Sequence, residues 1–264
     1  MEPKLLVLDF DGVVCDGVDE MVESSWRTLA RLAPPPPPLT DQLKSRFREL
    51  RPTIESGWEM VVLVGVLGEI SPAQDEGLKS AAGWASARDA YVQAHGLNRL
   101  QLTQEFDASR VDWIRQDRAS WVAAHRFYPG VADWLRGLIR EDRLVYILST
   151  KGKEFLDVLV ESQKVPLPTE RVIGKTEPRR DKWDVLAELA EKHRVDPPDL
   201  WFVEDRLETL LEMQRKAPGF AARVFFATWG YVFAEDTLAA QRAGIPTLTL
   251  EQATGPFERW EKDP

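Results

Sequence analysis

The chain has 264 residues, of which 44% are hydrophobic and 29% are charged, a composition typical of a folded protein with one large domain or two modest ones. Its formal net charge of −9 disfavours a nucleic-acid binder or a membrane-surface binder, because both need clustered positive charge. The single cysteine, Cys15, excludes an intrachain disulfide and suits a reducing compartment, so we expect a cytoplasmic protein.

Short apolar runs rich in Val, Ile and Leu occur at residues 5–8, 144–148, 200–203 and 223–227. Such runs are typical of strands that are buried on both faces of a parallel sheet. After Pro129 and Gly130, apolar residues at positions 131, 134, 135, 138 and 139 have the spacing of an amphipathic helix. Because strand and helix alternate, the sequence predicts an α/β fold with a Rossmann-like parallel sheet.

Residues 17–126 interrupt this alternation, since they contain no convincing strand run and their apolar residues follow helical spacing. We therefore expect a core formed by residues 1–16 and 127–264, with residues 17–126 inserted as an all-helical cap over the sheet edge where the first strand ends. The apolar run 60–67 is too short to span a bilayer, and we expect a buried helix there. Residues 34–38 are five consecutive prolines, which predict an extended connector between two helices.

Two carboxylates, Asp9 and Asp11, come directly after the first apolar strand. Like charges this close repel each other and raise the carboxyl pKa unless a cation offsets them. A hard divalent ion with oxygen ligands is the natural partner. The alternative is that both residues only shape the turn before Gly12, but matching groups at later strand ends favour a functional site.

Polar groups of complementary type follow the later segments. Ser149 directly follows the second predicted strand, where a hydroxyl can hold a phosphate oxygen. Lys182 begins a predicted helix, where a cation is electrostatically unfavourable unless an anion lies beside it. Glu204 and Asp205 follow the third predicted strand, with Glu208 shortly after. Since the carboxyl ends of parallel strands meet at one edge of a sheet, these groups predict one metal-assisted site.

The order of these motifs resembles that of the haloacid dehalogenase superfamily. The four motifs of that superfamily match, in turn, Asp9 with Asp11, Ser149, Lys182, and Glu204 with Asp205. Three further phrases are similar to its phosphoglycolate-phosphatase-like branch: Tyr128-Pro129-Gly130-Val131, Thr228-Trp229-Gly230-Tyr231 and Arg242-Ala243-Gly244-Ile245-Pro246. The resemblance covers the whole predicted core, and the helical insertion corresponds to the cap of that superfamily. The acidic motif departs from the usual Gly-Asp, and Lys175 stays an alternative to Lys182.

The resemblance implies a magnesium-dependent phosphatase acting on a small phosphorylated metabolite. Asp9 would attack phosphorus to form an aspartyl-phosphate, and Asp11 would protonate the leaving oxygen and then activate water. Lys182 would neutralise the phosphoryl oxygens and Ser149 would orient them. The magnesium ligands would be Asp9, the backbone carbonyl of Asp11, and Asp205, with Glu204 or Glu208 assisting.

Other functions stay open at this point. A phosphomutase would use the same motifs but return the phosphate to a second hydroxyl. A catalytically idle protein would use the tryptophan-rich insertion as an interaction surface. The polar and aromatic cluster that includes Arg46, Arg51 and Trp58 lies in the predicted cap, but its spacing also fits a solvated helix face. The sequence leaves the substrate and the oligomeric state open, and we expect neither a nucleic-acid partner nor a membrane.

Overall fold

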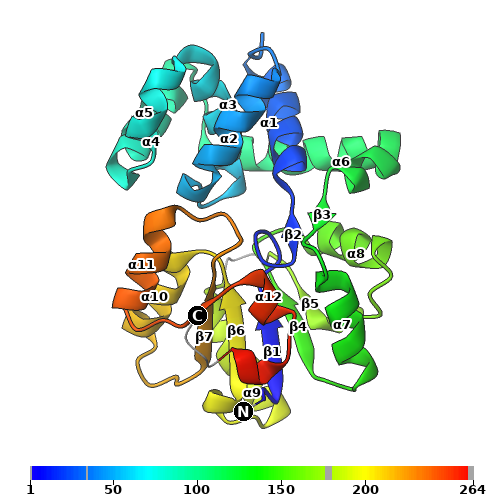
Figure 1. Cartoon of the computed structure of the whole chain (residues 1–264). Coiled ribbons are helices and arrows are strands. Elements are labelled where there is room, and N and C mark those ends of the chain that lie inside the picture. Colours follow the sequence, from blue (N-terminus) through cyan, green and yellow to red (C-terminus); the bar gives the residue numbers. More distant parts are fainter. Residues whose placement is uncertain (1, 34, 176–179, 261–264) are drawn as a thin grey trace. The chain divides into compact units, whose positions relative to one another are not determined.

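The computed structural model describes residues 2–33, 35–175 and 180–260, and the chain divides into two compact units (Figure 1). The core unit comprises Met1–Asp16 and Arg126–Pro264, and the helical unit is Gly17–His125. The second boundary lies one residue before the predicted one, because Arg126 pairs with Asp16 where β2 (Cys15–Asp16) meets β3 (Arg126–Phe127) as an antiparallel pair.

Within the described residues, the core unit holds a six-stranded parallel sheet with the order β5-β4-β1-β6-β7-β8. The strands are β1 (Leu5–Leu8), β4 (Val145–Leu148), β5 (Val172–Ile173), β6 (Leu200–Glu204), β7 (Arg223–Ala227) and β8 (Thr247–Leu248). β1 is central, because Leu6 is in register with Val145 of β4 on one side and with Trp201 of β6 on the other. The predicted α/β fold with a Rossmann-like parallel sheet is thus confirmed.

Helices surround this sheet within the core unit. They are α7 (Val131–Arg140), α8 (Lys153–Ser162), α9 (Lys182–His193), α10 (Leu207–Lys216), α11 (Ala234–Arg242) and α12 (Leu250–Ala253), with single turns η3 (Thr169–Arg171), η4 (Pro197–Asp199) and η5 (Phe257–Arg259). The predicted amphipathic helix is α7, which starts after Gly130 in a left-handed conformation with φ 81° and buries Val131, Leu135 and Leu138.

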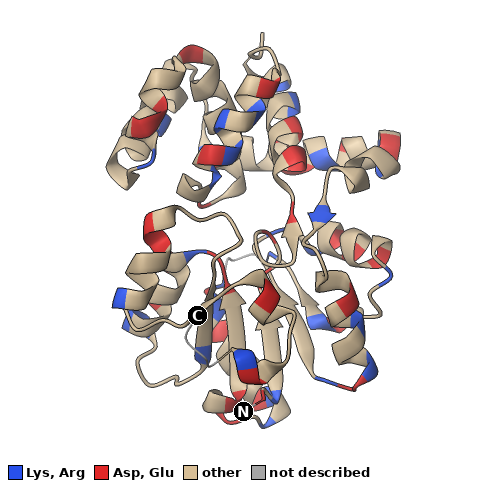
Figure 2. Ribbon diagram, in the orientation of Figure 1, with Lys and Arg blue, Asp and Glu red and all other residues tan. Residues whose placement is uncertain are grey.

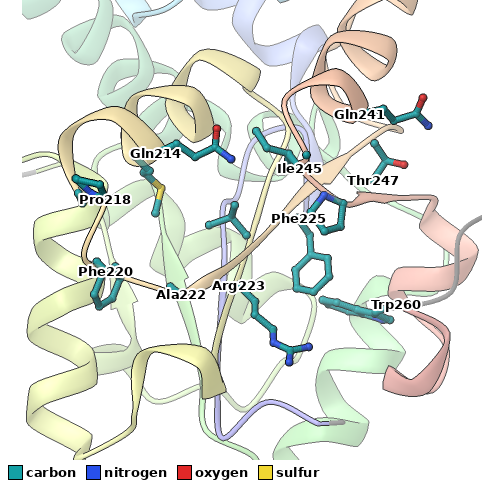
Figure 3. Close-up of a pocket in the computed structure, with 15 residues that line it drawn as sticks. Gln214, Pro218, Phe220, Ala222, Arg223, Phe225, Gln241, Ile245, Thr247 and Trp260 are labelled. Carbon is teal, nitrogen blue, oxygen red and sulfur yellow. The ribbon is translucent and has the colours of Figure 1, made fainter.

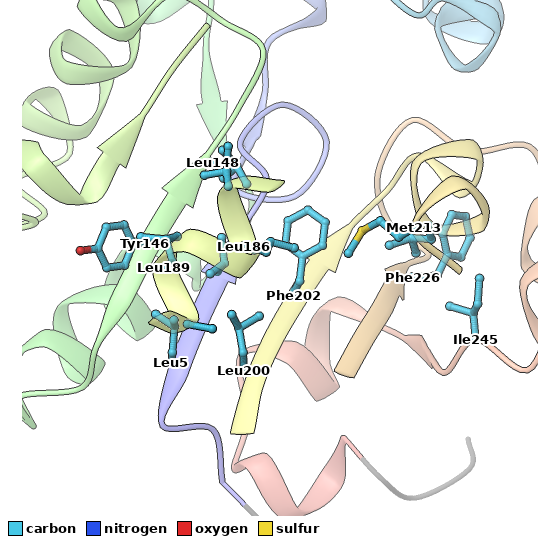
Figure 4. Close-up of a cluster of buried hydrophobic side chains, with 14 of the residues drawn as sticks. Leu5, Tyr146, Leu148, Leu186, Leu189, Leu200, Phe202, Met213, Phe226 and Ile245 are labelled. Atoms are coloured by element: carbon cyan, nitrogen blue, oxygen red, sulfur yellow. The ribbon is translucent and has the colours of Figure 1, made fainter. Parts of the chain in front are cut away.

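Both faces of the sheet are buried, as the uninterrupted apolar strands predict. On one face Leu5 and Phe202 pack in one hydrophobic cluster with Leu186 and Leu189 of α9 (Figure 4). On the other face Trp201 contacts an aromatic group, with a ring-centroid distance of 5.4 Å to Trp260. Burial of each of these Leu or Phe side chains stabilises the fold by about 1.5–3 kcal/mol. This packing on both faces holds the strands in place and so positions the residues at their carboxyl ends.

The helical unit contains helices and no strand among its described residues 17–33 and 35–125. It consists of α1 (Val18–Leu32), α2 (Asp41–Leu50), α3 (Gly57–Glu69), α4 (Asp75–Leu78), α5 (Ala81–Ala94) and α6 (Arg99–Ala123), with turns η1 (Arg51–Thr53) and η2 (Pro72–Gln74). The apolar run 60–67 lies in α3 and is buried along its whole length. Of the five prolines, Pro34 lies outside the described residues, and the other four lie outside helices between α1 and α2.

A buried polar cluster ties the two ends of the helical unit together. Glu20 of α1 has no exposed surface and accepts hydrogen bonds from Arg110 Nε at 2.7 Å and Nη2 at 3.0 Å. The Ser24 hydroxyl donates to the same carboxylate at 2.6 Å, and His125 Nε2 lies 3.6 Å from it. A buried carboxylate is tolerated only when it is paired in this way.

A membrane-spanning helix is not found in the part of the chain that the structure describes. The longest helix, α6 (Arg99–Ala123), carries charged side chains along its length.

Candidate active site

The predicted site residues lie at the carboxyl edge of the parallel sheet in the core unit. Asp9 follows β1, Ser149 follows β4, Glu204 ends β6 and Asp205 follows it, while Lys182 is the first residue of α9. In open α/β sheets, ligands bind in the crevice outside the carboxyl ends of the strands. The fold therefore positions these side chains where a ligand site is expected.

Asp9, Lys182 and Glu204 are in direct contact. Lys182 Nζ donates to Asp9 Oδ1 at 2.6 Å and to Glu204 Oε2 at 2.7 Å. The sequence argument for Lys182 was that a cation at a helix N-terminus needs an anion beside it, and two carboxylates are present there. The structure thus brings Lys182 to Asp9. The backbone N–H of the alternative residue, Lys175, donates to the Lys151 carbonyl at 2.8 Å.

Burial controls the electrostatics of this group. It raises the pKa of the Asp9 carboxyl above its ordinary value by more than the nearby Lys182 ammonium lowers it, and Glu204 and Asp11 add to the rise. Burial also lowers the pKa of Lys182, but Asp9 and Glu204 outweigh it and raise that pKa above its ordinary value. Lys182 therefore stays protonated, whereas burial opposes the negative charge of Asp9 despite the ammonium beside it.

Asp9, Glu204 and Asp205 form a buried cluster that fits a metal ion. Each offers a carboxylate oxygen, and these oxygens all lie within 4.8 Å of one another. Glu204 is already engaged at both oxygens, since Oε1 accepts from the backbone N–H of Arg206 at 3.1 Å and Oε2 accepts from Lys182. Three carboxylates with one lysine leave net negative charge, which suits a hard divalent cation with oxygen ligands.

Two alternatives from the sequence can now be placed. Glu208 is outside this carboxylate cluster; it lies in the first turn of α10, where its charge helps to raise the pKa of Asp236, although burial is the main cause. The Asp11 carboxylate is also outside the cluster. Its predicted role as a metal ligand concerned the backbone carbonyl, and that role stays a prediction.

Glycines allow the turn after β1 and the loop after β7 to close on Asp205. Gly12 has φ +90°, and Gly230 lies against both Gly12 and Asp205, where a Cβ would be 2.5 Å from the Gly12 carbonyl oxygen. The backbone N–H of Tyr231 donates to Asp205 Oδ2 at 2.8 Å, and Trp229 Nε1 donates to the Val13 carbonyl at 3.1 Å. The Trp229-Gly230-Tyr231 phrase therefore has a structural reason: it holds Asp205 and the turn after β1.

Sequence reasoning missed Lys151. Its side chain is only 2% exposed, and its Nζ lies 3.4 Å from Asp11 Oδ1. Its backbone N–H donates to Ser149 Oγ at 3.2 Å, so Ser149, Lys151 and Asp11 are neighbours. Among the described residues, no donor completes a hydrogen bond to the buried Asp11 Oδ1. The signal in the sequence was a lysine two residues after Ser149, at the same sheet edge as the carboxylates.

Two histidines and Arg46 make contacts away from the carboxylates of the candidate site. His95 pairs with Glu69 at 2.7 Å, and His193 Nε2 lies 2.8 Å from the Tyr146 hydroxyl. Burial raises the pKa of the Cys15 thiol well above its ordinary value, which disfavours a reactive thiolate. In the helical unit, Arg46 pairs with Asp75 and donates to two backbone carbonyls.

A pocket of about 950 Å³ lies elsewhere in the core unit (Figure 3). It is formed by the end of α10, the first residues of β7, the end of α11 and Trp260. The carboxylates and lysines of the candidate site do not line it. The candidate active site at the carboxyl edge of the sheet is therefore separate from this pocket.

Comparison with known proteins gives relatives of one kind. No family model matches the chain. A curated phosphoglycolate phosphatase 1 of Pseudomonas aeruginosa is 22% identical over 251 residues, which are 94% of this chain and 76% of the relative. A phosphoglycolate phosphatase of Pseudomonas putida is 23% identical over 201 residues, which are 76% of this chain and 57% of the relative.

The solved structures agree in fold. The crystal structure of a predicted phosphatase from Clostridium acetobutylicum superposes with a TM-score of 0.62 at 13% identity, over 96% of this chain and 97% of that one. Both curated relatives are named phosphatases, and the solved structure shares the fold of this chain. The chain is thus similar to phosphoglycolate phosphatases and shares the fold of a solved haloacid dehalogenase-like hydrolase from Streptococcus pneumoniae, with a TM-score of 0.53 at 14% identity over 94% of each chain.

Proposed function

We propose that the chain is a magnesium-dependent phosphatase that hydrolyses a small phosphomonoester through an aspartyl-phosphate on Asp9. The observation that carries the proposal is the setting of this carboxylate. It is buried at the end of the central strand, 2.6 Å from Lys182 Nζ, and it is grouped with two further carboxylates. Such an arrangement supports a nucleophile that works beside a cation.

The reaction has two displacements. In the first, an Asp9 carboxylate oxygen bonds to phosphorus, the bond from phosphorus to the leaving oxygen breaks, and Asp11 gives that oxygen a proton. In the second, Asp11 takes a proton from water, the water oxygen bonds to phosphorus, and the bond to Asp9 breaks to release phosphate. Covalent catalysis of this kind divides one slow hydrolysis into two easier steps.

The remaining residues stabilise charge on the phosphoryl group. Lys182 is fixed by Asp9 and Glu204, and its ammonium neutralises phosphoryl oxygens as charge develops on them. Ser149 orients the same group through its hydroxyl. Asp9, Asp205 and the backbone carbonyl of Asp11 would hold Mg²⁺, which supplies further positive charge there when it is bound. Because both Glu204 oxygens are engaged, we assign Glu204 a contact through water.

The substrate proposal comes from the relatives. Both curated relatives are named phosphoglycolate phosphatases, so we propose a small phosphorylated acid such as 2-phosphoglycolate as the substrate. We propose that the helical unit acts as a cap that contributes to substrate selection. The proposed location is the cytoplasm, which the single buried cysteine supports.

Hydrolysis is the favoured reaction among the alternatives raised by the sequence. A phosphomutase needs a second acceptor hydroxyl placed in line with the aspartyl-phosphate, and a catalytically idle protein has no use for a buried Asp9 with a raised pKa. Neither relative carries the name of a mutase or of a scaffold.

The test is phosphate release from a panel of phosphomonoesters and sugar phosphates in the presence of Mg²⁺, with 2-phosphoglycolate included. We expect free phosphate from at least one small member. Interconversion of sugar phosphates with little phosphate release would instead establish a mutase. Absence of turnover together with absence of labelling of Asp9 by beryllium fluoride would overturn the proposal in favour of an idle protein.

A further inference from the structure

The candidate site contains two buried lysines, and they accompany different carboxylates. Lys182 Nζ lies against Asp9 and Glu204, at 2.6 and 2.7 Å. Lys151 Nζ lies 3.4 Å from Asp11 Oδ1. The proposed mechanism gives Asp9 the bond to phosphorus and Asp11 the proton for the leaving oxygen. Lys182 is therefore on the nucleophile side of the reacting group, and Lys151 is on the leaving-group side.

The segment that carries Lys151 is held firmly in place. The backbone of Lys151 makes two hydrogen bonds. Its N–H donates to Ser149 Oγ, and its carbonyl accepts from the backbone N–H of Lys175. Gly174 packs so closely on this loop that a Cβ there would lie 2.5 Å from the backbone nitrogen of Lys153. A residue fixed in this way presents its charge at a defined point, which is a requirement for selectivity.

Burying a second ammonium group at this edge is costly unless it meets negative charge. Charged residues of both signs are interspersed along the ribbons of the two units (Figure 2), and the chain as a whole carries a net charge of −9. An anionic substrate therefore depends on local lysines for attraction. Lys182 serves the phosphoryl group, so a cation beside Asp11 serves whatever charge the leaving group carries.

We propose that Lys151 is a specificity-determining residue, which binds an anionic group, a carboxylate in the first place, on the leaving part of the substrate. This inference rests on the proposed phosphatase function and goes beyond it, because it assigns the selection of a phosphorylated acid to a residue of the core unit. Lys151 donates from Nζ to the carboxylate, while Asp11 delivers its proton to the leaving oxygen a few atoms away.

The test compares two phosphomonoesters that differ in the charge of the leaving group. The leaving group of 2-phosphoglycolate carries a carboxylate, whereas that of ethylene glycol monophosphate, called the neutral ester below, is uncharged. For Lys151→Met we expect kcat/KM for 2-phosphoglycolate to fall about 10- to 100-fold, chiefly through KM, as loss of a charged hydrogen bond predicts. We expect the loss of kcat/KM for the neutral ester to be smaller by about tenfold or more, since both substrates lose the contact between Lys151 and Asp11 but only 2-phosphoglycolate also loses a charged contact of its own.

Two further variants complete the design. Lys151→Arg keeps the positive charge and should restore part of the preference for the carboxylate, which also guards against a variant that simply misfolds. Lys153→Met is the matched control, because Lys153 is a partly exposed lysine on the same segment that pairs with Asp157 at 2.9 Å. It should leave the ratio between the two substrates unchanged.

The outcomes separate the inference from the function on which it rests. Equal losses on both substrates in Lys151→Met would overturn the inference, because Lys151 would then act on the phosphoryl group or on Asp11 alone. A wild-type enzyme that shows no preference for 2-phosphoglycolate would overturn it as well, while leaving phosphatase activity intact. A wild-type chain that hydrolyses neither ester would overturn the proposed function, and the inference with it.

Discussion

Gly12 and Asp205 are packed so closely that a Cβ on Gly12 would lie 1.9 Å from Asp205 Oδ2. The glycine also has φ +90°, where an L side chain costs about 1–2 kcal/mol. We therefore expect Gly12→Ala to displace the Asp205 carboxylate and to weaken Mg²⁺ binding by at least about tenfold, since one ligand of a hard cation is lost. Isothermal titration of the purified variant with Mg²⁺ measures this.

A second glycine separates the two effects of that substitution. Gly244 has φ +70°, but a Cβ there would meet nothing within 4 Å. Gly244→Ala should therefore show a similar backbone cost of about 1–2 kcal/mol in the free energy of unfolding and leave Mg²⁺ affinity unchanged. If both variants lost Mg²⁺ binding equally, the close packing of Gly12 on Asp205 would not be what matters.

Asp9→Asn should abolish phosphatase activity, with a loss of at least about 10³-fold in kcat, while the fold persists. The amide keeps the size of the side chain, and Lys182 retains Glu204 as its counter-charge at 2.7 Å. Steady-state kinetics and a thermal melt measure the two effects. The control is Asp199→Asn, which makes the same change at the last residue of η4, where Asp199 pairs with Lys4 at 2.7 Å. Turnover like that of the wild type in Asp9→Asn would disprove the proposed nucleophile.

Removal of the metal should stop the reaction. EDTA should abolish phosphate release and Mg²⁺ should restore it, because the buried cluster of Asp9, Glu204 and Asp205 needs a cation to offset its charge. Ca²⁺ should substitute poorly, since it takes 6–8 oxygen ligands at longer distances and would misplace Asp9. Full activity in metal-free buffer, with the circular dichroism spectrum unchanged, would contradict this prediction.

His193 should make folding sensitive to pH. Burial lowers the pKa of this imidazole, and Lys192 and Arg171 lower it further. The unfolded chain therefore takes up a proton near pH 6.5 before the folded chain does, so His193 contributes to a loss of stability as the pH falls through that value. Denaturant unfolding at pH 8 and at pH 5.5 should show a smaller loss for His193→Gln than for the wild type. An NMR titration that gave His193 a pKa above 6.5 would refute the argument.

The sequence was most informative where burial and chemistry coincide. Short, mainly apolar runs predicted β1, β4, β6 and β7 to within a residue at each end, because a strand covered on both faces is apolar except at its ends, where Glu204 and Arg223 lie. Lys182 could be singled out for a similar reason, since a lysine at the start of a helix is unfavourable unless carboxylates compensate for it, and Asp9 and Glu204 do so.

What the sequence did not reveal depends on short or non-local contacts. β5 and β8 have two residues each, too few for any periodicity, and they exist because a neighbouring strand supplies their hydrogen bonds. Lys151 was missed because a lysine after a strand is usually solvated, and only the fold brings it within 3.4 Å of Asp11. Gly230 was missed for a similar reason. Only the close approach of Gly12 and Asp205 in the folded chain leaves no room for a side chain at this position.

The buried contact between Glu20 and His125 bears on the order in which the chain folds. β1 is made first, but its neighbours β4 and β6 are made only after the whole helical unit. Once the helical unit has formed, Glu20 and His125 lie 3.6 Å apart. The segment that joins β1 to β4 then has a much shorter effective length. Shortening the connection from 136 residues to about 30 lowers its closure cost by about 1 kcal/mol. The helical unit is thus expected to fold first and to prepare the nascent chain for closing the sheet around its earliest strand.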